Sequence, residues 1–211
     1  MRPFLPVAFL LILGVGCAMP VAESADDADP AKPEPLGCLL VGPPSCQAGT
    51  APGLKVTLIN RTGADIYLIR SLDASDCKWR LPYCHLEIIG PDGMPCDVNH
   101  PWCANVNTIT AQDFVMVPAG GTFDPYIQLD GTGYLNAHQL RGENFQKVGA
   151  HRIRFVYSTK SEDIGRFIGW IGVGRDQTQA DSDRIAEMFP KVPKVEARSN
   201  EIVVETFTLG K

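Results

Sequence analysis

The sequence lacks the short motifs that mark several large classes of enzyme. None of its four histidines begins a His-Glu-x-x-His motif, which would place two zinc ligands and a general base on one helix. The Gly-x-Ser-x-Gly elbow of serine hydrolases is also missing. The glycine-containing stretches at 131–133 and 169–174 are not followed by a helix in the register that a nucleotide-binding loop needs. We therefore predict a protein that is not an enzyme and that carries no cofactor.

An excess of basic residues is absent as well. The chain has 19 lysines and arginines against 24 aspartates and glutamates, a formal net charge of −5, and losing Arg2 with the leader described below makes it −6. Nucleic acids and anionic bilayers attract basic surfaces. We expect no nucleic-acid partner and no electrostatic binding to a membrane. After the leader, no apolar run approaches the roughly 20 residues that cross a bilayer.

Residues 1–17 resemble the signal peptide of a bacterial lipoprotein. Arg2 gives a positive start, and residues 4–15 form an apolar stretch of the length of a signal h-region. Cys17 follows, and in such signals this cysteine becomes the lipidated first residue, although Gly14 stands where leucine is usual. Cleavage after Ala18, which gives a secreted or periplasmic protein, is the alternative. Both alternatives predict export. With a lipidated Cys17, we expect the lipid anchor to be the chain's only contact with the membrane of the cell envelope.

Residues 18–53 are predicted to be a tether and lead-in to a folded domain at 54–211. Between 18 and 36 the chain is rich in acidic residues and proline and has almost no large apolar side chains. Such a segment cannot bury enough surface to offset the entropy lost on ordering, so we expect it to be flexible. A Cys-bearing, Gly/Pro-rich stretch then leads into the domain.

The domain at 54–211 is predicted to be all-β, with about seven or eight strands. The clearest strand is 149–157, in which Ile153, Phe155 and Tyr157 alternate with Arg152 and Arg154, so that one face lies in a core and the other in water. We expect it to be the central strand. The other strands are predicted from alternation and turn residues at 54–60, 65–70, 85–89, 114–117, 122–129, 166–173 and 201–209.

Two further signals complete the expected architecture. Gly-Pro-Asp-Gly at 90–93 predicts a turn after the strand at 85–89. A short helix is predicted in an insertion near 175–198, because Asp181 can cap it, Ile185 and Met188 have helical spacing, and Pro190 ends it. The predicted role of this helix is packing.

The order of several short motifs resembles that of immunoglobulin-like β-sandwich domains in exported bacterial lipoproteins. These motifs are Leu-x-Val-x-Leu-x-Asn at 54–60, Pro-Asp-Gly at 91–93, Val-Pro-Ala-Gly-Gly-Thr at 117–122, the strand at 149–157, and Ser-Asn-Glu-Ile-Val-Val at 199–204. A similar order occurs in the β-sandwich prodomain of deuterolysin-type metalloproteases, here without the protease. The resemblance implies an antiparallel immunoglobulin-like sandwich. His151 stands where such domains usually carry tyrosine, and we expect it to be a buried core or corner residue.

Six cysteines follow Cys17, and an even number in an exported chain predicts disulfides. Cys38 and Cys46 are expected to pair with each other. For the other four, the spacing allows 77–84 with 96–103, or 77–103 nested around 84–96; these candidates are Cys77, Cys84, Cys96 and Cys103.

A metal site is the alternative for this cysteine-rich region, because His85, Met94 and His100 lie among the cysteines. The spacing matches neither the Cys-x2-4-Cys nor the His-x3-5-His pattern of zinc sites, nor a loop that would hold copper. We therefore expect structural disulfides and no metal.

The candidate ligand-binding residues are Trp79, Tyr83 and Trp102, since aromatic side chains on braced loops are favoured in recognition surfaces. Together these features predict a non-catalytic cell-envelope lipoprotein that binds an extracellular or periplasmic protein or glycan. One alternative is a protease inhibitor or prodomain-like module. A second is a periplasmic metal-binding protein.

Overall fold

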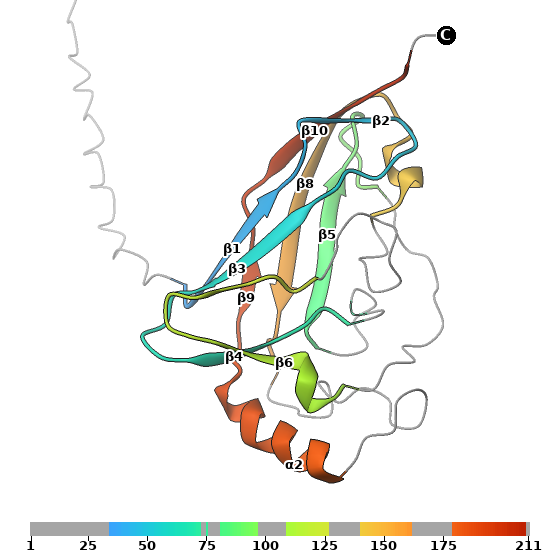
Figure 1. Cartoon of the computed structure of the whole chain (residues 1–211). Coiled ribbons are helices and arrows are strands. Elements are labelled where there is room, and N and C mark those ends of the chain that lie inside the picture. The colour runs from blue at the N-terminus through green and yellow to red at the C-terminus, as the bar shows by residue number, and fades with distance from the viewer. Residues whose placement is uncertain are drawn as a thin grey trace, which may run out of the picture. The chain divides into compact units, whose positions relative to one another are not determined.

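The computed structural model describes residues 34–72, 75, 81–96, 109–126, 140–161 and 179–209, and within them it is built mostly of strands (Figure 1). The strands are β1 (Leu36–Val41), β2 (Ser45–Gln47), β3 (Lys55–Asn60), β4 (Ile66–Ile69), β5 (Tyr83–Ile89), β6 (Phe114–Val117), β7 (Thr122–Phe123), β8 (Gly149–Ser158), β9 (Glu196–Arg198) and β10 (Ile202–Phe207). The α-helix is α2 (Gln179–Met188), and short 3-10 helices are η2 (Ala111–Asp113), η3 (Gly142–Phe145) and η4 (Phe189–Lys191). The all-β prediction is confirmed, but the described residues hold ten strands, more than the seven or eight expected.

The strands form three hydrogen-bonded groups. One sheet has the order β1-β3-β7, and a larger one has the order β2-β10-β8-β5, with β9 also pairing with β8. β4 and β6 make a separate two-stranded ribbon. The pairs are antiparallel except β2 with β10, which run parallel. The expectation of purely antiparallel pairing is therefore wrong at this one pair.

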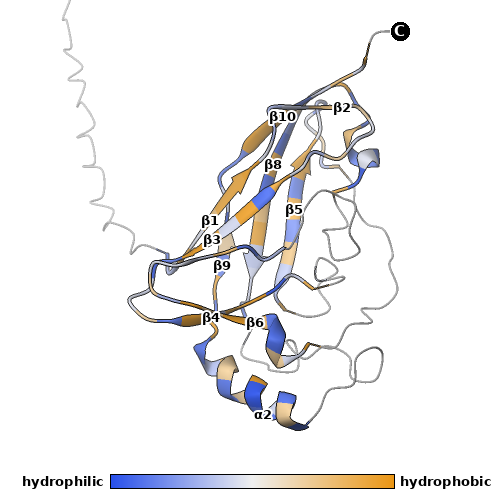
Figure 2. Ribbon diagram, in the orientation of Figure 1, coloured by the Kyte–Doolittle hydropathy of each residue, from blue (hydrophilic) through white to orange (hydrophobic). Residues whose placement is uncertain are grey.

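β8 is the central strand of the larger sheet, as predicted. It lies between β10 and β5, with Ile153 opposite Ile202 on one side and opposite Ile88 on the other. Ile153, Phe155 and Tyr157 are fully buried, whereas Arg152 and Arg154 are exposed. Figure 2 shows this alternation as hydrophobic and hydrophilic bands along the strand. A period of two in the sequence thus sets which face of the sheet meets the core.

Both sheets contribute to one hydrophobic core. Leu58 of β3, Leu86 of β5, Phe155 of β8 and Val204 of β10 all belong to the same buried cluster. A second cluster lies between the β4–β6 ribbon and the helical segment, and includes Ile69. The two clusters are the interior of the described part of the chain.

The predicted helix is confirmed as α2, within the expected insertion. Its apolar residues Ile185 and Met188 are buried in the second cluster, and the chain passes at Phe189 into η4, where Pro190 stands. Proline lacks an N–H donor and is tolerated at the first positions of a helix, which fits its place in η4. No helix within the described residues has the length and apolar character that crossing a bilayer requires.

Three strands lie where none was expected. β1 and β2 fall inside the predicted lead-in at 18–53, and β9 falls inside the predicted insertion. Leu36 and Leu40 of β1 are buried core residues. The outer edge of β1 is partly closed by Asn200, whose side-chain amide accepts from the Leu40 N–H at 2.9 Å and donates to the Leu40 carbonyl at 3.0 Å. The sheets therefore begin before residue 54. The predicted strand at 166–173 lies outside the described residues.

Candidate functional site

The turn that follows β5 is the centre of the candidate site. Gly93 adopts a positive φ of 77°, and its N–H donates to the Gly90 carbonyl at 2.9 Å, so the predicted Gly-Pro-Asp-Gly turn is confirmed. Cys96 then returns alongside β5 and donates its N–H to the Ile88 carbonyl at 2.8 Å. We call residues 90–96 the 90–96 turn. A hollow lies on each side of it.

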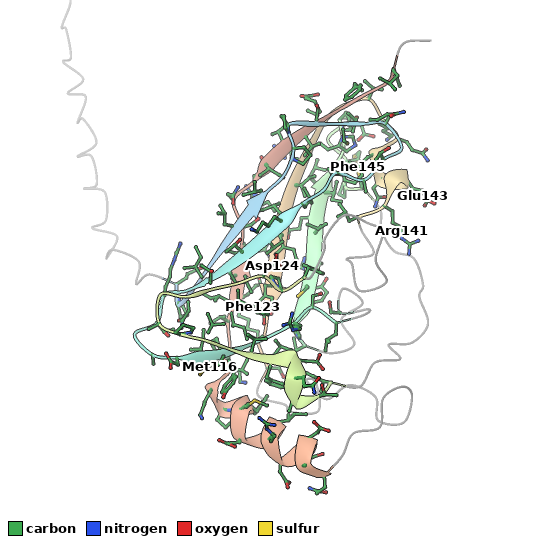
Figure 3. All side chains as sticks on the ribbon, viewed as in Figure 1. Met116, Phe123, Asp124, Arg141, Glu143 and Phe145 are labelled. Carbon is green, nitrogen blue, oxygen red and sulfur yellow. The ribbon has the colours of Figure 1, made fainter. Side chains whose placement is uncertain are left out.

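The first hollow, which we call the His151 pocket, has a volume of about 200 Å³. It is formed where the 90–96 turn meets η3 and the start of β8. Figure 3 shows Phe145 of η3 on the side facing the strands and Glu143 on the side facing away. The residues that line the pocket are Gly90, Asp92, Met94, Pro95, Cys96, Glu143, Asn144, Lys147 and His151.

His151 supplies the buried wall of this pocket. Its side chain is fully buried, as expected, and its ring lies beside Phe145 with the centroids 5.2 Å apart. Nδ1 is 3.2 Å from the carbonyl oxygen of Gly149. Because a carbonyl can only accept, Nδ1 carries a proton, and in the tautomer with this single proton Nε2 is an acceptor. Nε2 is buried and has no hydrogen-bond partner among the described residues.

An exposed ion pair stands at the rim of the pocket. Lys147 Nζ lies 2.5 Å from Asp92 Oδ2. The hydrogen bond from Lys147 lowers the pKa of Asp92, helped by the Met94 N–H, and the same carboxylate raises the pKa of Lys147. Both side chains are well exposed to solvent, so the pair adds little to stability. Its effect is to neutralise the charge of Asp92 at the rim.

Cys96 lies between the two hollows and is a protonated thiol. Its Sγ is 3.5 Å from the Asn144 carbonyl, to which it donates. Burial raises the pKa of Cys96, and the nearby charge of Asp92 raises it further. A thiol reacts as a nucleophile through its thiolate, so this environment does not activate it.

The second hollow, the outer groove, has a volume of about 380 Å³ and lies on the solvent face of the larger sheet. It shares Pro95 and Cys96 with the His151 pocket, so the two hollows meet at the 90–96 turn. Its lining residues are Leu86, Glu87, Ile88, Ile89, Pro95, Cys96, Arg152, Arg154 and Glu201.

Ion pairs cover the sheet around this groove. Arg152 and Arg154 share Glu201: Arg152 Nε lies 3.9 Å from Oε1, and Arg154 Nη2 lies 3.4 Å from Oε2. Arg198 Nη1 lies 2.6 Å from Glu87 Oε1, and this hydrogen bond raises the pKa of Arg198. Half or more of the Arg152 and Arg198 side chains is exposed (58% and 53%). The groove is therefore bordered by positive and negative groups that remain accessible to a partner.

The structure places Tyr83, one of the three predicted binding residues, away from both hollows. Tyr83 is at the opposite end of β5 from the 90–96 turn, half-buried, with its ring stacked on His85 at a centroid distance of 4.3 Å. It packs against the second core cluster. Trp79 and Trp102 lie outside the described residues, so their part of the prediction remains a prediction.

The structure also differs from the expected disulfides. Cys38 and Cys46 are both thiols. Cys38 belongs to β1 in the smaller sheet and Cys46 to β2 in the larger one, so they lie in strands of different sheets and not within one loop. The predicted 38–46 bridge is not formed.

Cys96 is likewise a thiol, so neither expected bridge that includes it, 84–96 or 96–103, is formed in this structure. Cys84 is fully buried in β5 and lies opposite Tyr157. The remaining candidates, Cys17, Cys77 and Cys103, lie outside the described residues. Within the described part of the chain, no three His, Cys, Asp or Glu side chains are grouped as a metal site would require.

Sequence reasoning predicted the turn and the burial of His151 but missed the pocket that joins them. The pocket residues are about fifty positions apart in the chain, and only folding brings them together. The one local signal was the charged residue inside the turn, Asp92. No protein-family model matches the sequence, and no curated protein is similar enough to count as a relative. The function must therefore be argued from the geometry.

Proposed function

We propose that this chain is a non-catalytic binding protein of the bacterial cell envelope, held by a lipid on Cys17, with an immunoglobulin-like β-sandwich that binds a protein partner. The observation that carries the binding role is the outer groove with its exposed ion pairs beside the 90–96 turn. The lipoprotein-like leader supports the envelope location, and two sheets on a shared core fit the sandwich.

A protein fits the groove better than the other classes of macromolecule. Arginine and glutamate alternate across the sheet face, so a partner with both charges can exchange these ion pairs for its own. The glutamates disfavour the phosphates of nucleic acid. A neutral glycan would have no charge with which to replace an ion pair, and the lining of the groove contains no aromatic ring on which a sugar could stack. Arginine is also favoured at the centre of protein interfaces.

Site-directed photo-crosslinking in the native envelope tests the partner surface. A photoreactive phenylalanine in place of Ile89, in the groove, should give one discrete protein adduct. The same group in place of Lys55, exposed on β3 of the other sheet, should not. Arg154→Glu should reduce the adduct about tenfold, as expected for a central charged contact. Equal adducts from positions 89 and 55, or an adduct indifferent to Arg154→Glu, would refute this surface.

Intact mass of the protein from its own envelope tests the anchor. We expect a mature chain that begins at Cys17 and carries acyl chains. A chain that begins at Met19 and carries no lipid would show that the protein is secreted or periplasmic and not anchored. The partner surface would still be tested by the cross-linking experiment.

A further inference from the structure

We propose that the His151 pocket is a separate binding site for a small neutral molecule that carries hydroxyl groups, of about the size of one sugar unit. This inference goes beyond the partner surface on the outer groove. It starts from a single atom, the Nε2 of His151, which is buried and has no hydrogen-bond partner among the described residues although its ring lines a hollow of about 200 Å³.

The chemistry of Nε2 requires a donor. The Nδ1 proton is used on the Gly149 carbonyl, so Nε2 offers a lone pair and no hydrogen. Leaving a buried polar atom unpaired costs about 1–3 kcal/mol. The S–H of Cys96, which also lines the pocket, is directed to the Asn144 carbonyl. Since no described residue supplies this hydrogen bond, we assign it to a molecule that enters the pocket.

The charges at the pocket favour a neutral occupant. A carboxylate has no proton to give to Nε2 at neutral pH, a phosphate group keeps one in only a minor fraction of molecules, and either anion would meet the carboxylate of Glu143. A cation would meet Lys147, which already neutralises Asp92. Placing a bare charge against a fully buried side chain is also costly. A molecule with several hydroxyl groups can donate to Nε2 through one and accept from Lys147 through another, so it matches both polar groups of the lining.

The size of the pocket indicates more than a single bound water. A water molecule needs about 10–15 Å³ of such space, and this pocket has about 200 Å³. The volume is below the roughly 300 Å³ at which pockets for drug-sized ligands begin, so it suits one small ring or a short polyol.

Long-range ¹⁵N NMR of the imidazole nitrogens tests the proposal on the whole exported chain. The probes are glucose, galactose, N-acetylglucosamine and glycerol, with methylammonium and acetate as charged comparisons. A hydroxyl that donates to Nε2 moves the resonance of this nitrogen upfield and leaves Nδ1 nearly unchanged. We expect at least one neutral probe to give this shift of Nε2, and the shift to reach a plateau as the probe concentration rises.

Two variants separate binding from folding. His151→Leu removes the acceptor and should weaken the probe about two- to tenfold. Because His151→Leu replaces a core residue and could disturb folding, Gly90→Ala is the second test. The Cβ of this alanine would lie 3.1 Å from Asp92 Oδ1 and 3.5 Å from Cys96 Sγ, so it would narrow the pocket and leave the His151 ring in place. It should weaken the probe about fivefold or more. Gly53→Ala, whose Cβ meets nothing within 4 Å, is the matched control and should bind like the parent protein.

Three results would overturn the proposal. The first is no shift of Nε2 with any probe up to its solubility, which would mean that water alone fills the pocket. The second is a shift with methylammonium or acetate but with no neutral probe. The third is unchanged affinity in folded Gly90→Ala. None of these results affects the cross-linking from position 89, so failure of this site and failure of the partner surface can be told apart.

Discussion

Replacing Tyr157 by phenylalanine removes the hydroxyl that ties the central strand to the β4–β6 ribbon. Tyr157 Oη accepts from the Ile69 N–H at 2.9 Å and donates to the Ile69 carbonyl at 3.0 Å. Both residues are fully buried, Tyr157 in the first core cluster and Ile69 in the second. The two hydrogen bonds therefore join the two clusters.

The expected cost follows from the groups left behind. Tyr157→Phe keeps the ring and its packing but leaves the buried N–H and carbonyl of Ile69 unpaired, at about 1–3 kcal/mol each. Because β4 belongs to a two-stranded ribbon that can shift slightly, we place the loss at about 3 kcal/mol. For a chain of 211 residues this lowers Tm by about 6–12 °C.

Urea and thermal unfolding followed by circular dichroism measure this loss. The matched control is Tyr67→Phe, since Tyr67 is a half-buried tyrosine of β4 whose hydroxyl makes no hydrogen bond within the described residues. We expect the control to stay within about 0.5 kcal/mol of the parent protein. Equal stabilities of the two variants would show that the Tyr157–Ile69 hydrogen bonds do not hold the clusters together.

Three further predictions follow from other contacts. Gly142→Ala should strongly destabilise the fold, because its Cβ would fall 2.0 Å from the Gly49 carbonyl oxygen; Gly53→Ala, with open space around it, is the control in the same unfolding assay. Burial raises the pKa of Cys38 from 9.0 to about 12. At pH 8 the native thiol should therefore react with iodoacetamide about a thousandfold more slowly than the thiol of the urea-unfolded chain, because only the thiolate reacts. Mass spectrometry measures the two rates, and equal rates would contradict the burial of Cys38. Since the folded chain keeps protons on Cys38 and Tyr157 that the unfolded chain releases, the free energy of unfolding should fall as pH rises above 9, and a flat profile to pH 11 would contradict this.

The sequence predicted those strands whose alternation is long and uninterrupted. β8, β5, β3 and β10 each alternate inward and outward positions over at least six residues, and this is enough to fix both strand and face. The strand predicted at 122–129 is described only as far as residue 126, and within that part only Thr122–Phe123 forms a strand, β7. Short strands lack a period that can be recognised, and pairing with a distant neighbour decides whether they form.

The unexpected strands show why local pattern was insufficient. β2 has only three residues, and it pairs in parallel with β10, so that Ser45 lies opposite Glu205 although the two are far apart in the sequence. β9 is equally short and is held by β8, with Ala197 opposite Tyr157. The candidate site depends on the same kind of long-range contact, between the 90–96 turn and the start of β8. The conformation of the turn could be predicted from its own residues, whereas the elements that pack against it could not.

The inward face of β8 carries two polar side chains, and their different surroundings separate structure from binding. Tyr157, near one end, has both hydrogen-bonding functions of its hydroxyl satisfied by the backbone of Ile69. His151, near the other end, has only one nitrogen satisfied. A buried polar group kept for stability alone is expected to be fully paired, because each unpaired atom costs free energy. Tyr157 meets this condition and His151 does not. That asymmetry, on one strand and one face, is why we place the ligand at the His151 end.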